Sequence, residues 1–81
     1  MHIETLVKMA NDIGSFFQAE PDHAEAVQGV FEHLRKFWDP RMRKQIVAHY
    51  HAGGLGLSSL AREAVRKLAD EMESIVQSGD G

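Results

Sequence analysis

The sequence predicts an all-α fold, a small bundle of three to four amphipathic helices. Apolar residues recur at steps of three and four along four segments, as they do in helices that bury one face. No segment alternates apolar and polar residues in the manner of a half-buried strand. Proline or glycine stands near the boundaries of these segments, at Pro21, Pro40 and Gly53. The chain is therefore expected to fold as consecutive helices with short connections.

The first helix is expected from Ile3 to Phe17. Its apolar stripe consists of Ile3, Leu6, Ala10, Ile13 and Phe17, with Met9 and Phe16 beside it. The helix should end before Pro21, because a proline disfavours the α conformation in the residue that precedes it. Gly14 in this helix and Gly29 in the next each cost about 1 kcal/mol relative to alanine, which indicates that another backbone passes close to them.

The second helix is expected from about Asp22 to the sequence "WDPR". Its stripe consists of Val27, Phe31, Leu34 and Trp38, flanked by Val30 and Phe37. Asp39 can cap the start of a third helix, and Pro40 fits the first helical position because no hydrogen bond is lost there. The second helix should therefore end where the third begins, with almost no linker between them.

The third helix should end at "HAGGLG", where Gly53 or Gly54 can adopt the left-handed conformation. Its apolar residues are Met42, Ile46, Val47 and Tyr50. The fourth helix should begin at Ser58 or Ser59 and run to about Gln77. Its inward residues are expected to be Leu60, Ala61, Ala64, Val65, Leu68, Met72, Ile75 and Val76. Residues 1–78 are then one helical domain, and residues 79–81 a frayed tail.

Two ion pairs are predicted along single helices. Glu32 and Lys36, and Glu63 and Lys67, have the favourable i,i+4 order on outer faces. Each such pair contributes only a few tenths of a kcal/mol.

Composition narrows the class of protein. With 81 residues, the chain should bury only about 60% of the surface that it exposes when unfolded. It has no cysteine, which excludes disulfides and thiolate metal sites and is compatible with a reducing cytosol. The N-terminal sequence lacks the features of a signal peptide, and no apolar run is long enough to span a membrane. We expect a soluble, cytoplasmic protein.

No catalytic, cofactor-binding or metal-binding residues are predicted. None of the five histidines has a second histidine four residues away with which to chelate a metal on a helix. The serines lack the context of an activated nucleophile. The glycines of "AGGLGL" follow no strand and precede no lysine, so a helix C-cap and a short hydrophobic link explain them better than a phosphate loop. The chain is not expected to be an enzyme.

The segment "LRKFWDPRMRKQ" is then the candidate for a binding surface. It gathers five of the nine lysines and arginines around the only tryptophan, although the net charge of the chain is −3. A nucleic-acid surface is one interpretation, but the short break between the helices and the acidic balance weigh against it. Phe37 is expected in the core. For Trp38, a core position and a contact position both stay open, because tryptophan with arginine is typical of interface hot spots.

Three segments carry a resemblance to a known family. "LVKMANDIGSFF", "HLRKFWDPRMRKQI" and "AGGLGL" are similar to the delta subunit of molybdenum-containing, NAD-dependent formate dehydrogenase. The likeness extends from about Leu6 to Leu68, and "FWDPRM" is its most specific element.

The resemblance implies a non-catalytic accessory subunit of a cytoplasmic complex that oxidises formate and reduces NAD. Molybdopterin, iron–sulfur clusters and flavin would then belong to the larger subunits, and this chain would dock on the molybdenum-bearing catalytic subunit, supporting assembly or cofactor retention. The expected partner-binding residues are Trp38, Asp39, Pro40, Arg41, Arg43, Arg35 and Lys44. The alternatives are a transient maturation factor for insertion of the molybdenum cofactor and a small nucleic-acid-binding regulator.

Overall fold

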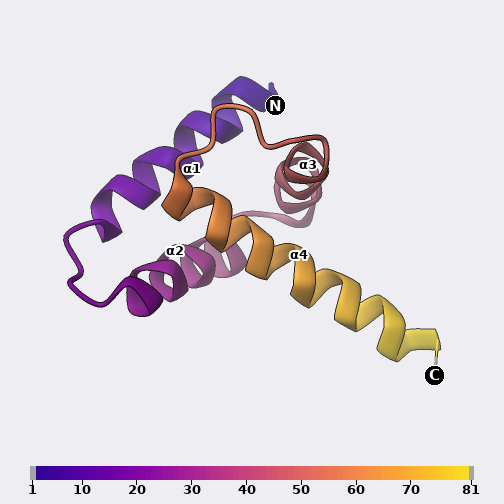
Figure 1. The fold of residues 1–81 in the computed structure, drawn as a ribbon. Helices are drawn as coiled ribbons and strands as arrows, with labels where there is room; N and C mark the ends of the chain where they lie inside the picture. Colours follow the sequence, from indigo (N-terminus) through magenta and orange to yellow (C-terminus); the bar gives the residue numbers. More distant parts are fainter. Residues whose placement is uncertain (1, 81) are drawn as a thin grey trace.

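Four helices follow one another along the chain in the computed structural model (Figure 1). The structure describes the backbone of residues 2–80 and the side chains of residues 2–73. The helices are α1 (Ile3–Phe17), α2 (His23–Phe37), α3 (Pro40–His51) and α4 (Ser59–Asp80). No strand occurs in the described backbone. The predicted all-α class is confirmed.

Short polar side chains cap the N-termini of three helices. The Asp22 carboxylate accepts from the Glu25 N–H at 3.2 Å, and the Asp39 carboxylate accepts from the Met42 N–H at 2.9 Å. Ser58 Oγ accepts from the Ala61 N–H at 3.3 Å and so caps α4. These bonds satisfy backbone donors that lack a partner in the first turn. The predicted caps at Asp39 and Ser58 are confirmed.

The fourth helix is longer than predicted. It continues through Asp80 instead of ending near Gln77. Its last turns extend beyond the other three helices (Figure 1). Fraying of residues 79–81 stays a prediction, and Gly81 lies outside the described residues. The inward placement predicted for Ile75 and Val76 also falls outside the described side chains.

All four helices contribute to one apolar core. Helix α2 packs against α1 and α4, while α3 packs against α4 and α1. Leu6, Leu34, Ile46 and Leu68, one from each helix, are fully or almost fully buried. None of the described helices is long and apolar enough to cross a membrane.

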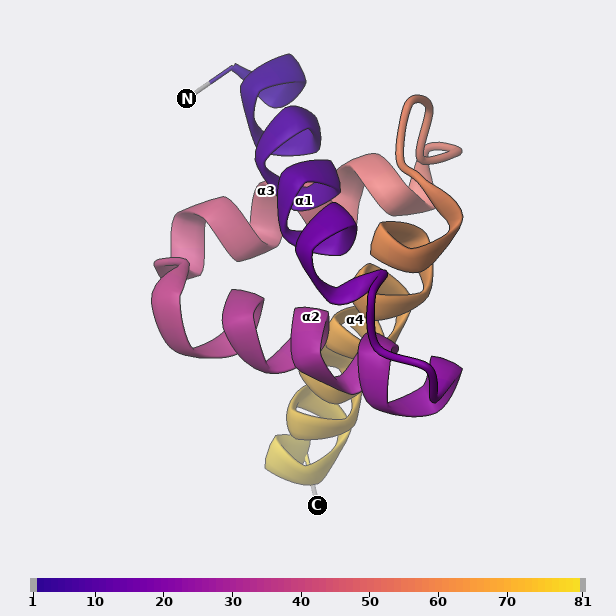
Figure 2. The same cartoon turned by 90° about the vertical axis from the view of Figure 1, so that its left-hand side faces the viewer.

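Two phenylalanines that lie beside the predicted apolar stripes are not buried. The Phe16 side chain is 76% exposed and that of Phe37 is 72% exposed, so the expectation that they join the core is wrong. The Phe17 ring lies directly over Gly29, where α1 crosses α2. The two helices diverge from that crossing (Figure 2), and Phe37 lies about two turns further along α2. Phe37 therefore stays exposed in the part of the chain whose side chains are described.

The predicted ion pair between Glu63 and Lys67 is also wrong. Glu63 Oε2 lies 2.6 Å from His23 Nε2, and Lys67 Nζ donates to the Gln28 amide oxygen. Both partners belong to α2, which packs against α4. Contacts between these two helices therefore replace the pair within α4. The pair between Glu32 and Lys36 does form, with 3.9 Å between the atoms.

The glycines after α3 end that helix as predicted. The Gly53 N–H donates to the Tyr50 carbonyl at 3.1 Å, and the Gly54 N–H donates to the His49 carbonyl at 2.9 Å. Gly53 and Gly54 have φ values of +119° and +65°, in the region that glycine adopts without strain. Together these bonds form the reversal that commonly ends a helix with glycine.

The two helix-interior glycines should respond oppositely to alanine. A Cβ atom at Gly29 would lie 2.5 Å from the Phe17 ring, whereas one at Gly14 would lie 3.5 Å or more from its neighbours. We expect Gly29→Ala to lower the free energy of unfolding by about 1–3 kcal/mol through overpacking. Gly14→Ala should raise it by about 0.5–1 kcal/mol through helix propensity. Urea unfolding of both variants measures this, and a stabilised Gly29→Ala would contradict the close packing at the crossing.

Candidate docking surface

The joint between α2 and α3 is organised around Trp38. Its side chain is only 5% exposed and belongs to the core. Its backbone is extended, with φ −85° and ψ 138°, and its N–H still donates to the Leu34 carbonyl at 3.2 Å. Asp39 is extended as well, which the following proline requires. Of the two positions left open for Trp38, the structure shows the core.

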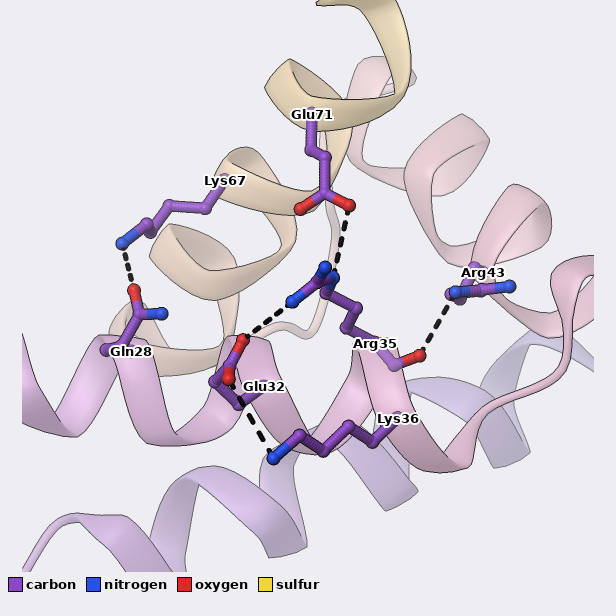
Figure 3. Close-up of polar contacts among 7 residues, drawn as sticks. All are labelled: Gln28, Glu32, Arg35, Lys36, Arg43, Lys67 and Glu71. Atoms are coloured by element: carbon purple, nitrogen blue, oxygen red, sulfur yellow. Dashed lines mark hydrogen bonds and ion pairs between the residues drawn. The ribbon is translucent and has the colours of Figure 1, made fainter. Parts of the chain in front are cut away.

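Two of the predicted contact residues are engaged inside the chain (Figure 3). Arg35 Nη1 donates to Glu32 Oε1 at 3.3 Å, and Arg35 Nε lies 3.3 Å from Glu71 Oε1. Arg43 Nη1 donates to the Arg35 carbonyl at 3.1 Å. Arg35 thus links α2 to α4, and Arg43 on α3 satisfies a carbonyl in the last turn of α2. These half-exposed contacts, each worth about 1 kcal/mol or less, hold the joint in place.

Three exposed residues of the segment remain available, Pro40, Arg41 and Lys44, which we call the basic corner. Together with Asp39 they line a surface hollow. Among the described residues, Arg41 and Lys44 have no ion pair and no side-chain hydrogen bond. Arg41 lies in the first turn of α3, where a cation is unfavourable by about 0.3–1 kcal/mol because it faces the positive end of the helix dipole. Arg41 and Lys44 thus place two unpaired positive charges beside this hollow.

A second surface lies between α1 and α2, and sequence reasoning missed it. Its members are the apolar residues Ile13, Phe16, Phe17 and Phe37 together with the ring of His33, which we call the aromatic face. The first four, with Asp12, line a groove. The Phe16 and Phe17 rings meet edge to face at 5.1 Å between centroids, and the Phe37 ring lies 4.8 Å from the His33 ring.

The sequence does carry a signal for this face. Phe16 precedes Phe17, and Phe37 precedes Trp38, so that each helix ends in two adjacent large apolar residues. Phe16 and Phe17 lie about 100° apart around α1, whereas Phe37 and Trp38 are separated by the change from helical to extended backbone at Trp38. One member of each pair is therefore left on the surface.

Two histidines of α3 contact other groups of the chain. His51 Nε2 lies 3.2 Å from Glu73 Oε1, and His49 Nε2 lies 2.8 Å from the Leu55 carbonyl. Across the described residues, no group of three or more histidine, cysteine, aspartate or glutamate side chains could hold a metal ion.

Comparison with known proteins gives one match. The chain matches the family described as "NADH-dependant formate dehydrogenase delta subunit FdsD" over residues 5–65. Searches of curated proteins and of solved structures find no match. The matched range includes both the aromatic face and the basic corner.

The neighbours Phe37 and Trp38 should differ sharply when truncated. Trp38→Ala removes a buried indole and should lower the free energy of unfolding by about 3–5 kcal/mol. Phe37→Ala removes an exposed ring and should change it by about 1 kcal/mol or less, since only the contact with His33 is lost. Thermal and urea unfolding followed by circular dichroism measure both. Equal effects of the two substitutions would contradict the burial described for the joint.

Proposed function

The chain belongs to the NADH-dependent formate dehydrogenase delta subunit family, and from this premise we propose that it is a non-catalytic accessory subunit of a cytoplasmic NAD-dependent formate dehydrogenase complex. It docks on the molybdenum-bearing catalytic subunit and supports assembly or cofactor retention there. The family match carries the proposal, since it spans α1, α2, α3 and the first turns of α4.

The redox cofactors belong, in this proposal, to the larger subunits. Iron–sulfur clusters are held by cysteine thiolates, and this sequence contains no cysteine. Molybdopterin and flavin are likewise assigned to the partners, as the family resemblance implies. The contribution of this chain is then mechanical: it covers a surface of the catalytic subunit and stabilises the arrangement that retains the cofactor.

The aromatic face and the basic corner support docking because one partner surface can cover both. Phe37 and Pro40 are three positions apart, so their Cα atoms lie within about 11 Å of each other. Aromatic residues and arginine are the types most enriched at the centres of protein interfaces. The matching surface on the catalytic subunit has an apolar ridge for the groove and carboxylates opposite Arg41 and Lys44.

Removing the two exposed rings should weaken docking without unfolding the chain. We expect the double variant Phe16→Ser, Phe37→Ser to reduce co-purification with the catalytic subunit at least tenfold, because interface aromatics commonly cost 2 kcal/mol or more when removed, or about 30-fold in affinity. Quantitative gel analysis of tagged complexes measures the co-purified amount. The control is Ala48→Ser, because Ala48 is an exposed residue of α3.

Molybdenum content in the same preparations connects docking with the cofactor. It should fall together with co-purification if the chain retains the cofactor. Undiminished co-purification of a folded double variant would count against the aromatic face. Absence of the wild-type chain from the purified active enzyme would instead favour a transient maturation factor.

Charge reversal tests the basic corner separately. Arg41→Glu, Lys44→Glu should slow association and make it less sensitive to salt, since exposed interface charges act mainly on the association rate. Stopped-flow or biolayer measurements at two ionic strengths provide the rates. Arg66→Glu is the matched control, because Arg66 is exposed on α4 and has no ion pair among the described residues. Equal loss in both variants would indicate a general charge effect and no localised contact.

A further inference from the structure

The aromatic face combines a groove and a ridge on one side of the molecule. The groove lies between α1 and α2, has a volume of about 350 Å³, and is lined by Asp12, Ile13, Phe16, Phe17 and His33. That volume lies within the range of pockets that accept small ligands. The groove is therefore large enough to receive one aromatic side chain of another molecule.

One end of the groove is closed, and the ridge stands at the other. At the closed end the Phe17 ring lies so close to Gly29 that a Cβ atom there would overlap it. Gly29, His33 and Phe37 are four positions apart and thus share one face of α2. The Phe37 ring lies 4.8 Å from the His33 ring and continues this wall about 12 Å beyond Gly29. Because α1 and α2 diverge from their crossing (Figure 2), the Phe37 ring stands beside the open end of the groove.

The aromatic face carries little charge that would repel a copy of itself. The carboxylate that lines the groove, that of Asp12, lies 3.1 Å from Lys8 Nζ. The other groove residues are apolar except for His33, which is counted as neutral at pH 7. The basic corner differs, because a symmetric contact through it would bring like charges together. Of these two surfaces, the aromatic face is the one suited to a second copy of the chain.

The exposed area is sufficient for a small interface. Phe16 is 76% exposed and Phe37 is 72% exposed. With about 200 Å² for a whole aromatic side chain, the four rings of two copies supply roughly 600 Å². Ile13, Phe17 and His33 are partly exposed and add to this area. Specific interfaces bury about 1,200–2,000 Å² in total and weak ones less, so the area fits a weak, reversible dimer.

We infer that two copies of the free chain associate through the aromatic face about a two-fold axis, with Phe37 of each copy in the groove of the other. A symmetric contact of this kind requires complementary features on the same surface, because each copy presents the same patch. The aromatic face has a ridge beside a groove and meets that requirement. The inference concerns the free chain and does not depend on the proposed function.

The dimer and the proposed complex use the same face and therefore exclude each other. In the dimer, the exposed rings of the free chain are covered before docking. Docking on the catalytic subunit then requires that the dimer dissociates. A weak dimer allows this exchange, because a partner that binds the monomer more tightly shifts the equilibrium by mass action.

Sedimentation equilibrium of the full chain tests the dimer. We expect mainly monomers at about 1 µM and mainly dimers at about 500 µM, as for a contact at the low end of interface sizes. Phe37→Ser should raise the dissociation constant of the dimer about 10-fold or more, as for a hot-spot side chain. Circular dichroism shows whether this variant remains folded.

Leu55→Ser is the matched control for Phe37→Ser. Leu55 is 85% exposed but lies in the loop between α3 and α4, outside the aromatic face. Its substitution should leave the dissociation constant within about twofold of wild type, as for an ordinary surface position. A wild-type chain that stays monomeric at the highest concentration would overturn the inference. So would equal losses in the two variants, which would indicate general stickiness and no localised contact.

Introduced cysteines test the arrangement within the dimer. The chain has no cysteine of its own, so a disulfide between copies reports only on the introduced positions. In an equal mixture, the Ile13→Cys and Phe37→Cys chains should form the mixed disulfide faster than either chain pairs with itself. The reason is that the groove of one copy faces the ridge of the other. Faster pairing of the Phe37→Cys chain with itself would overturn the contact between ridge and groove.

The inference and the proposed function fail independently. If the wild-type chain is monomeric throughout but co-purifies with the catalytic subunit, only the inference is overturned. If the chain dimerises as described but binds none of the larger subunits, the inference stands and the proposed function fails.

Discussion

Burial of Trp38 at the joint between α2 and α3 is the constraint on which the remaining structure depends. Pro40 forces Asp39 out of the helical region, and Trp38 is extended beside it, so the chain must change direction there. The indole is the largest side chain available to fill the space inside that bend. With it in place, α3 is oriented to pack against both α4 and α1.

The polar contacts around the joint reinforce this geometry. Arg35 and Arg43 connect three helices through carboxylates and a backbone carbonyl (Figure 3). Their role is to keep the exposed part of the same segment in a fixed position. Arg41 and Lys44 are then presented from a helix whose start these contacts hold against α2.

A chain of this size has more apolar surface than its own helices can cover. Phe16, Phe37 and Leu55 are the large apolar side chains that remain outside the core. The two phenylalanines lie where α1 and α2 diverge, and Leu55 lies in the loop between α3 and α4. An accessory subunit whose remaining apolar surface is covered by a larger partner is consistent with this distribution.

The sequence by itself determined the helices, their caps and most of the core, because these depend on local chemistry. Asp39, Pro40 and Ser58 act within one helical turn, and the spacing of Leu6, Leu34 and Leu68 identifies the buried faces. Membership of the family was also readable, from "FWDPRM" and its neighbours. Only the tertiary structure decided which aromatic residue of each adjacent pair packs against or within the core, which group pairs with Glu63, and that Leu55 is exposed while Leu57 is buried. Those outcomes depend on how far neighbouring helices extend and where they cross. A local sequence pattern does not specify either of these.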